Sequence, residues 1–378
     1  MHFCSRRLLN LPFSLSSHVS TSAAWEAADF PDPAAYTTRL SPTHLAELEA
    51  LAASVPAGTP IHTVALTPAR RTLAPTLGPL LERTAAEVRA GRGFALLKGM
   101  PADTIDMYAT CLRCWLAGLL LCGGAPAGIR PTNAAGHLIG HVADTGADPA
   151  DPTTRLYATA AAQPWHNDSA DTVALLCLGV AAAGGGSAWA SSVAIAAALL
   201  REDPPAAALL AGRGIWFYDR RGEVPAGKAP FFEMPVFNHS ADGSVKVNLS
   251  SNYYASAAAR FPEAVPPLSA AQKAAVAKVE AMAASPRFML ACSLQPGDLQ
   301  LLNNHTCLHT REAFADGPGG RRHLLRLWLS SPLDPPLPAV YGELYGSDAL
   351  TPGERGGIRV DGLTLKAEDC YVPLSPGG

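Results

Sequence analysis

The sequence predicts a mainly β protein of the α+β class, with a β-barrel or jelly roll braced by helices. Short apolar runs separated by glycine and proline turns fill most of the second half of the chain. Helical patterns concentrate toward the front, and the strands are not regularly followed by helices, which argues against a parallel doubly wound sheet. No repeat with a period of about 20 to 50 residues recurs, so a solenoid is not expected.

Composition narrows the class of protein. The chain has 378 residues, 48% of them hydrophobic and 16% charged, which is enough for a sizeable core in one large domain or two ordinary ones. The net charge of −3 comes with no basic block, so a nucleic-acid partner is not expected. The apolar stretch from Trp115 to Cys122 is too short to cross a membrane. Eight scattered cysteines form no disulfide framework, which favours a reducing, intracellular compartment.

The first 24 residues differ from the rest of the chain. They contain Arg6, Arg7 and several serines, and no acidic residue precedes Glu26. This composition is typical of a transit peptide for a mitochondrion or plastid, and equally of a disordered terminus. The sequence favours neither interpretation, and without a transit peptide we expect a cytoplasmic protein.

Helix signals dominate the next part of the chain. Ser41 is a good N-cap before a proline, and a second helix is expected over about 77–89. The apolar run 93–99, which glycines flank, predicts a buried strand, and a third helix follows over about 104–121. Residues 123–155 have no sustained period and predict a long loop.

Strand signals follow from residue 163 onward. Alternating valines and polar residues predict a hairpin with one buried face, built from 235–239 and 244–250. Ser269 begins a capping box, which predicts a helix to about Ala284. The remaining strands are expected at 173–180, 215–219, 288–294, 299–309 and 322–330.

One short motif carries the chemistry. His166 and Asp168 lie two residues apart, so on a strand their side chains share a face. They would supply two ligands of a 2-His-1-carboxylate site, which leaves iron(II) with open positions. The same spacing is common by chance, so a third ligand is needed. Trp165 and Asn167 flank the pair, and pocket lining and local packing are equally good interpretations of them.

The third ligand should come from a later strand. His309 ends a strand candidate that a Pro-Gly-Asp turn precedes, which would aim its imidazole into a barrel mouth. His305 lies four residues earlier on the same face of a regular strand and is the alternative. Farther on, Arg322 and Arg326 share one face of an apolar strand. Buried arginines are costly unless they meet anions, so one of them can hold the distal carboxylate of a keto-diacid and the other a second anion or a structural partner.

These features together resemble a known family, the iron(II)/2-oxoglutarate-dependent dioxygenases of the taurine dioxygenase type, with a clavaminate-synthase-like fold. The resemblance spans roughly Trp25 to Ser331. The motifs that carry it are Gly93–Gly99 (GFALLKG), Trp165–Asp168 (WHND), Gly184–Ser187 (GGGS), Gln295–Asp298 (QPGD), Asn303–Arg311 (NNHTCLHTR) and Arg322–Arg326 (RHLLR).

The resemblance implies a fold and a site. The fold would be a double-stranded β-helix, or jelly roll, flanked by helices, in a single domain over 25–332 with a C-terminal tail over 333–378. Iron would be held by His166, Asp168 and His309, and this placement favours His309 over His305. Arg322 would pair with 2-oxoglutarate and Ser187 would help to bind it. Arg326 matches a position that contacts an anionic substrate group in some members.

The expected activity follows from the same resemblance. An oxygenase of this type would use iron(II), 2-oxoglutarate and O₂ to hydroxylate a small molecule, with succinate and CO₂ as coproducts. Desaturation, cyclisation or dealkylation at the same centre is the first alternative. A jelly-roll protein that binds a small molecule without iron is the second. Neither a nucleic acid nor a membrane is expected as a partner, and no pattern bears on the oligomeric state.

Overall fold

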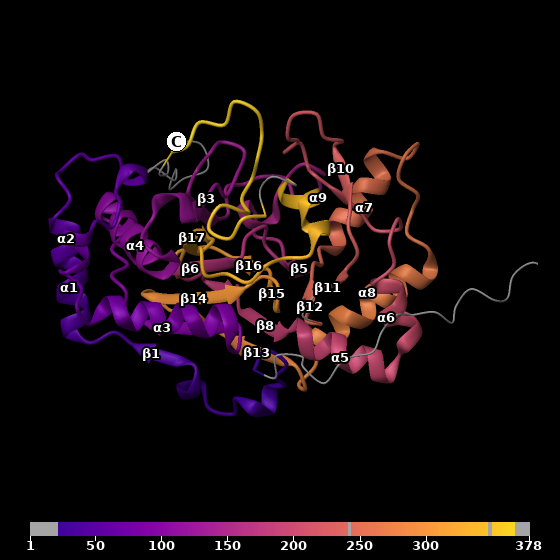
Figure 1. Cartoon of the computed structure of the whole chain (residues 1–378), viewed down its shortest axis with the longest axis horizontal. Helices are drawn as coiled ribbons and strands as arrows, with labels where there is room; N and C mark the ends of the chain where they lie inside the picture. Colours follow the sequence, from indigo (N-terminus) through magenta and orange to yellow (C-terminus); the bar gives the residue numbers. More distant parts are fainter. Residues whose placement is uncertain (1–21, 241–242, 347–349, 367–378) are drawn as a thin grey trace, which may run out of the picture.

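Two facing β-sheets form the centre of the molecule, with helices outside each of them (Figure 1). The computed structural model describes residues 22–240, 243–346 and 350–366. The predicted N-terminal segment therefore lies almost entirely outside the described residues. At its edge, the Ala23 carbonyl accepts a hydrogen bond from the Ser191 hydroxyl.

The larger sheet runs in the order β1-β2-β14-β6-β17-β3, and β4 also pairs with β17. All its pairs are antiparallel except β1 with β2. Its strands are β1 (Thr37–Arg39), β2 (Phe94–Lys98), β3 (Ile129–Arg130), β4 (Ile139–Ala143), β6 (Thr172–Gly179), β14 (Asp298–Asn303) and β17 (His323–Leu329).

The smaller sheet is antiparallel and runs in the order β13-β8-β15-β5. Its strands are β5 (Gln163–His166), β8 (Ser187–Ser191), β13 (Met289–Cys292) and β15 (Cys307–Arg311). Three two-stranded pairs complete the β structure: β7 (Ala183–Gly184) with β16 (Phe314–Ala315), β9 (Phe217–Asp219) with β10 (Phe231–Glu233), and β11 (Phe237–His239) with β12 (Val245–Val247).

A hydrophobic cluster between the sheets holds them together. It joins Phe94 and Val173 of the larger sheet to Trp189 and Leu290 of the smaller one, and all four are buried. The alternation of side chains along each strand makes this possible, because each strand sends one face inward and the other toward the helices. The mainly β fold with a jelly-roll core is the one predicted.

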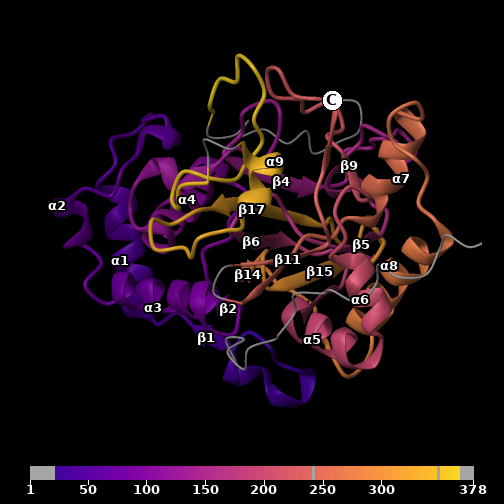
Figure 2. The ribbon, with the colours of Figure 1, turned by 45° about the vertical axis from the view of Figure 1, so that its right-hand side comes forward.

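Helices cover the outer face of each sheet, as Figures 1 and 2 show. Those that cover the larger sheet are α1 (Pro42–Ala53), α3 (Leu77–Ala90) and α4 (Met107–Cys122). Those that cover the smaller sheet are α5 (Ser192–Glu202), α6 (Pro204–Leu210) and α8 (Ala270–Ala283). The remaining helices are α2 (Pro68–Arg71), α7 (Ser251–Arg260) and α9 (Gly342–Tyr345). No helix in the described part of the chain is long and apolar enough to cross a membrane.

The predicted helix starts are confirmed. Ser41 accepts a hydrogen bond from the His44 N–H at the start of α1, and Ser269 does the same for Gln272 at the start of α8. Each is a capping box, in which the side chain at the third helical position also bonds back to the N-cap N–H. The buried strand between two glycines is present as β2.

Three predictions are corrected. The run 299–309 is two strands, β14 and β15, with a turn over 304–306, so His305 and His309 do not share a strand face. The predicted loop 123–155 contains β3 and β4, whose pairing with β17 gives order that their composition did not signal. The polar face of the hairpin β11–β12 is buried, because Asn238 and Lys246 both lie inside, and His239 at the end of β11 is its exposed residue.

The segment after β17 folds back onto the sheets. Arg355 is fully buried, and its Nε lies 2.8 and 3.0 Å from the two carboxylate oxygens of Asp171. The Gly357 N–H donates to the carbonyl of Ser169, one residue beyond Asp168. These contacts fix the segment beside the motif that carries the predicted metal ligands.

Candidate metal centre

The β5 strand places His166 at the centre of the molecule. The ring Nδ1 of His166 lies 2.8 Å from the carbonyl oxygen of Pro164, so Nδ1 carries the proton and donates it. The Nε2 atom is then the unprotonated one and can bind a metal. Such a backbone hydrogen bond fixes both the tautomer and the ring plane.

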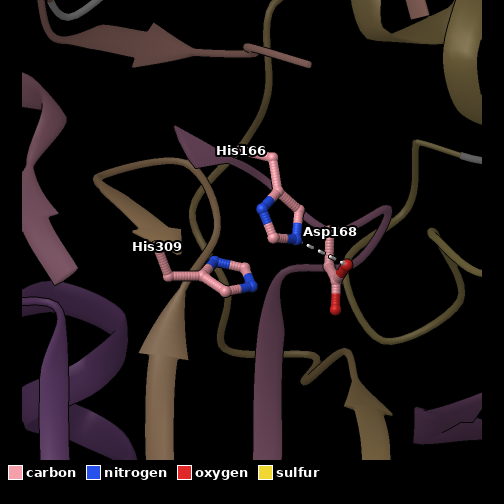
Figure 3. A group of neighbouring side chains, drawn as sticks. All are labelled: His166, Asp168 and His309. Carbon is pink, nitrogen blue, oxygen red and sulfur yellow. Dashed lines mark ion pairs between the residues drawn. The ribbon is translucent and has the colours of Figure 1, made fainter. Parts of the chain in front are cut away.

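The antiparallel pairing of β15 with β5 brings His309 opposite His166. The two residues are register partners, and their ring centroids are 4.1 Å apart. Figure 3 shows the outer nitrogen of His309 directed toward Asp168. The pairing of strands that are distant in the sequence thus creates the two-histidine half of the site.

Asp168 lies just after β5, and its carboxylate is oriented by several groups. Its backbone N–H donates to the side-chain oxygen of Asn304 at 3.0 Å. Its Oδ2 accepts from Trp328 Nε1 at 2.8 Å and from Arg326 Nη1 at 3.4 Å. Oδ1 lies 3.8 Å from His166 Nε2 (Figure 3). One oxygen is therefore occupied by donors, and the other faces the histidines.

The donor set fits a divalent metal ion. One possible ligand atom from each of His166, Asp168 and His309 lies within 4.8 Å of the others. Burial lowers the pKa of His166, and burial together with His166 lowers the pKa of His309 to about 3. Burial alone would raise the pKa of Asp168, but Arg326 and both histidines hold it well below its usual value. Two neutral imidazoles and one ionised carboxylate are the protonation states that iron(II) requires.

A small cavity of about 420 Å³, a volume that includes its open mouth, adjoins these ligands on the side of the β17 strand. Both predicted cosubstrate residues line it: Ser187, the first residue of β8, and Arg322, just before β17. A third polar side chain, that of Arg311, lines it as well. Gly185 has a φ of +79°, and a Cβ there would lie 3.0 Å from the Arg322 side chain. The glycine-rich turn before Ser187 is thus needed for the close approach to Arg322.

A larger cavity of about 1010 Å³, which includes its open mouth, also borders His166 and Asp168. Arg326 lines both cavities, so its side chain does reach the interior. Its guanidinium centre lies 4.5 Å from the ring centroid of Tyr157 and 4.6 Å from that of Trp328. The two rings and the contact with Asp168 hold this guanidinium in place.

Other predicted or rival residues have packing roles. Trp165 is buried in the core between the smaller sheet and its helices, because it points away from His166 on the same strand. Asn167 lines the large cavity, and its side chain also bonds the backbone of residues 249, 304 and 307. The rival ligand His305 donates to Asp171 at 2.8 Å instead of facing the site. His323 pairs with His141 at 2.8 Å.

Sequence reasoning missed three contributors to the site. Trp328 lies on the same face of β17 as Arg326, but its hydrogen bond to Asp168 was not foreseen. Arg311 lies two residues after His309, so period-two alternation could have indicated that both face the same interior. The segment Gly357–Arg359 lines the large cavity, and no local pattern indicates this.

Two facing sheets with a 2-His-1-carboxylate cluster between two cavities define a mononuclear non-haem iron oxygenase. The chain belongs to the TauD/TfdA family: residues 65–328 match the family described as taurine catabolism dioxygenase TauD, TfdA. It is therefore an oxidoreductase of the iron(II)- and 2-oxoglutarate-dependent dioxygenase type. The resemblance drawn from the sequence motifs is confirmed.

Individual relatives agree with this assignment. The chain is 30% identical over 259 residues to FR-33289 synthase of Streptomyces rubellomurinus, covering 67% of this chain and 73% of that protein. Among solved structures, it resembles the non-heme iron oxygenase OrfP in complex with Fe and alpha-ketoglutaric acid, with a TM-score of 0.55, 16% identity, and 79% and 94% of the two chains covered. For asparagine oxygenase in complex with Fe(II), 2S,3S-3-hydroxyasparagine and succinate, the TM-score is 0.54 and the identity 17%, with 78% of this chain and 93% of that chain covered.

Proposed function

We propose that the protein hydroxylates a small molecule in the large cavity, using iron held by His166, Asp168 and His309. The observation that carries this proposal is the position of the ligands between two cavities. His166 and Asp168 line both cavities, and His309 lines the smaller one. A cosubstrate in the smaller cavity and a substrate in the larger one would therefore both reach the same metal ion.

Different side chains of the protein would bind the cosubstrate and orient the metal ligands. Arg322 would pair with the distal carboxylate of 2-oxoglutarate, and the Ser187 hydroxyl would bind the same molecule. Bound iron(II) and 2-oxoglutarate supply the activation of O₂ that inserts one oxygen atom into a substrate C–H bond and the other into succinate, with release of CO₂. Buried partners fix the orientation of Asp168.

We further propose a small polar substrate that carries an anionic group. The large cavity is bordered by the guanidinium groups of Arg326 and Arg359, and by Tyr157 and Tyr253, which can donate hydrogen bonds. Its acidic lining residues Asp219 and Glu223 are each paired with an arginine. Among the similar solved structures, asparagine oxygenase holds 3-hydroxyasparagine and OrfP holds (3S)-hydroxy-L-Arg. Both compounds are small polar acids of the kind that such a cavity can bind, which supports an amino-acid-like substrate.

The first experiment tests the metal and cosubstrate sites. Anaerobic addition of 2-oxoglutarate to the iron(II) protein should produce a weak charge-transfer band in the visible. The variant H166A should lose this band, whereas H62A, which removes a histidine outside the lining of both cavities, should keep it. Absence of the band from the wild-type protein would contradict the proposal.

The second experiment identifies the outcome of the reaction. Candidate amino acids and other small acids are incubated with the iron(II) protein, 2-oxoglutarate and O₂, and succinate and product masses are measured. A gain of one oxygen supports hydroxylation. A loss of two hydrogens supports desaturation or cyclisation, and loss of an alkyl group supports dealkylation. If no compound stimulates succinate release above the basal level, the proposed substrate class is wrong.

A further inference from the structure

The small cavity contains a second buried arginine that the proposed function does not use. On β15, Arg311 follows His309 by two residues, so both side chains point into the same interior. Arg311 is the register partner of Ser187 on β8, which places it across from the predicted cosubstrate residue. Arg311, Ser187 and Arg322 all line the same cavity.

Arg311 and Arg322 share one aromatic support. The guanidinium centre of Arg311 lies 4.9 Å from the ring centroid of Phe314, and that of Arg322 lies 5.4 Å from it. Two like charges that contact one ring repel each other, and the repulsion is not screened by water because both residues are buried. The arrangement is therefore costly unless an anion lies between or beside them.

No carboxylate of the described residues forms an ion pair with either guanidinium, although the charge of Asp144 acts to raise the pKa of Arg311 and that of Asp316 acts to raise the pKa of Arg322. Neither guanidinium has an aspartate or glutamate within ion-pair distance, and Asp168 is the only acidic residue of the described chain that lines the cavity. Arg311 donates through Nη2 to the carbonyls of Leu156, Thr159 and Ala161. Its Nε and Nη1 are buried without a partner among the described residues, and so is Nη1 of Arg322.

The pKa values of both guanidinium groups are lowered. Burial and the charge of Arg322 lower the pKa of Arg311 to about 10, and burial lowers that of Arg322 to about 10 as well. Both remain protonated at neutral pH. A cavity with two such groups and unused N–H donors is built for an anion with more than one negative charge.

We propose that Arg311 provides a second positive charge for the cosubstrate, so that Arg311 and Arg322 together select a 2-oxo dicarboxylate over 2-oxo acids with an uncharged tail. This inference rests on the proposed placement of 2-oxoglutarate in the small cavity. Arg311 thus acts as a specificity-determining residue for the cosubstrate. Its contacts with three carbonyls hold the guanidinium at the cavity wall.

The test compares two probes that differ only at the far end, 2-oxoglutarate and 2-oxopentanoate. Both chelate iron(II) through the same 2-oxo acid group, so anaerobic titration of the charge-transfer band gives a dissociation constant for each. In R311Q the side chain is neutral and still has N–H donors for the carbonyls. The affinity of R311Q for 2-oxoglutarate should fall by about 30-fold or more, whereas that for 2-oxopentanoate should change by less than about threefold. R311K keeps the charge and should retain most of the discrimination.

Other results would overturn the inference. If R311Q weakens both probes by the same factor, Arg311 only supports the loop at residues 156–161. If R311Q binds both probes as the wild type does, the second charge has no role. If neither variant folds, the two dissociation constants of the wild-type protein decide the question. Two buried charge contacts should make the wild type bind 2-oxoglutarate about 1,000-fold more tightly than 2-oxopentanoate, and a preference below about 100-fold contradicts them. Loss of the band in the wild-type protein would instead contradict the proposed function.

Discussion

The hydrogen bond from Trp328 to Asp168 gives a sharp test of how the metal centre is held. Trp328 is fully buried on β17, and its Nε1 donates to Oδ2 of Asp168 at 2.8 Å. The substitution W328F removes this donor and keeps an aromatic ring in the core. We expect weaker metal binding, because the carboxylate can then rotate away from the orientation that leaves one oxygen for the metal.

The structure sets the size of the effect. A hydrogen bond to a charged group contributes about 1.5–3 kcal/mol, which corresponds to about 10- to 100-fold in a binding constant. Arg326 still donates to the same oxygen at 3.4 Å and keeps part of the restraint. The expected loss of metal affinity is therefore at the lower end, about tenfold.

Calorimetric titration of the metal-free protein with Mn²⁺, an air-stable substitute for iron(II), measures this affinity. The matched control is W115F, which removes a fully buried indole whose Nε1 donates to the Val64 carbonyl at 2.9 Å, on the outer side of the larger sheet. This control should lose stability but keep the metal affinity within about twofold. If W328F folds and binds Mn²⁺ as tightly as the wild type does, the reasoning about Asp168 is refuted.

Three further outcomes are expected. The variant R355M should lower the free energy of unfolding, measured in urea, by about 3–5 kcal/mol, because it leaves Asp171 buried without its guanidinium partner. A loss within error of zero would show that this ion pair does not stabilise the fold. H305Q should keep Mn²⁺ affinity within about threefold whereas H309Q loses it, and the reverse result would exchange the ligand assignment. Burial and Arg321 lower the pKa of His323 to about 4, so below pH 6.5 the unfolded chain takes up a proton that the folded protein does not. The contribution of neutral His323 to the free energy of unfolding is complete above pH 6.5 and is lost as the pH falls toward 4, by up to about 3 kcal/mol. The free energy of unfolding of H323Q should therefore depend less steeply on pH in this range.

Local patterns were enough to predict many of the separate elements and the proximity of His166 and Asp168. The capping boxes at Ser41 and Ser269 depend only on residues three positions apart, so they can be recognised in the sequence. His166 and Asp168 were paired by strand alternation. The arginine face of β17 followed from the same rule, and the structure places Arg322 and Arg326 at the cavities as that rule implies.

Long-range pairing was not readable from those patterns. The turn over 304–306, which contains His305, interrupts the predicted strand 299–309. Its polar residues Asn304 and Thr306 were predicted to be part of one strand, and the pairing of β14 with β6 and of β15 with β5 reveals the break. The same reason explains why β4 was missed, since its five residues are ordered by β17. The Asp171–Arg355 ion pair joins residues with no shared local pattern.

The segment 355–359, which follows β17 and borders the large cavity, has a consequence for how this enzyme can diversify. The family match ends at residue 328, whereas Ile358 and Arg359 border the large cavity from beyond that point. Arg355 anchors this segment on Asp171, so Ile358 and Arg359 can be exchanged while the anchor and the iron ligands stay in place. Divergence or laboratory evolution of the segment can thus retune what the enzyme oxidises without altering how it oxidises. Libraries randomised at 358 and 359, with Arg355 and Gly357 kept, would test this, because a side chain at 357 would clash with residues 130 and 131.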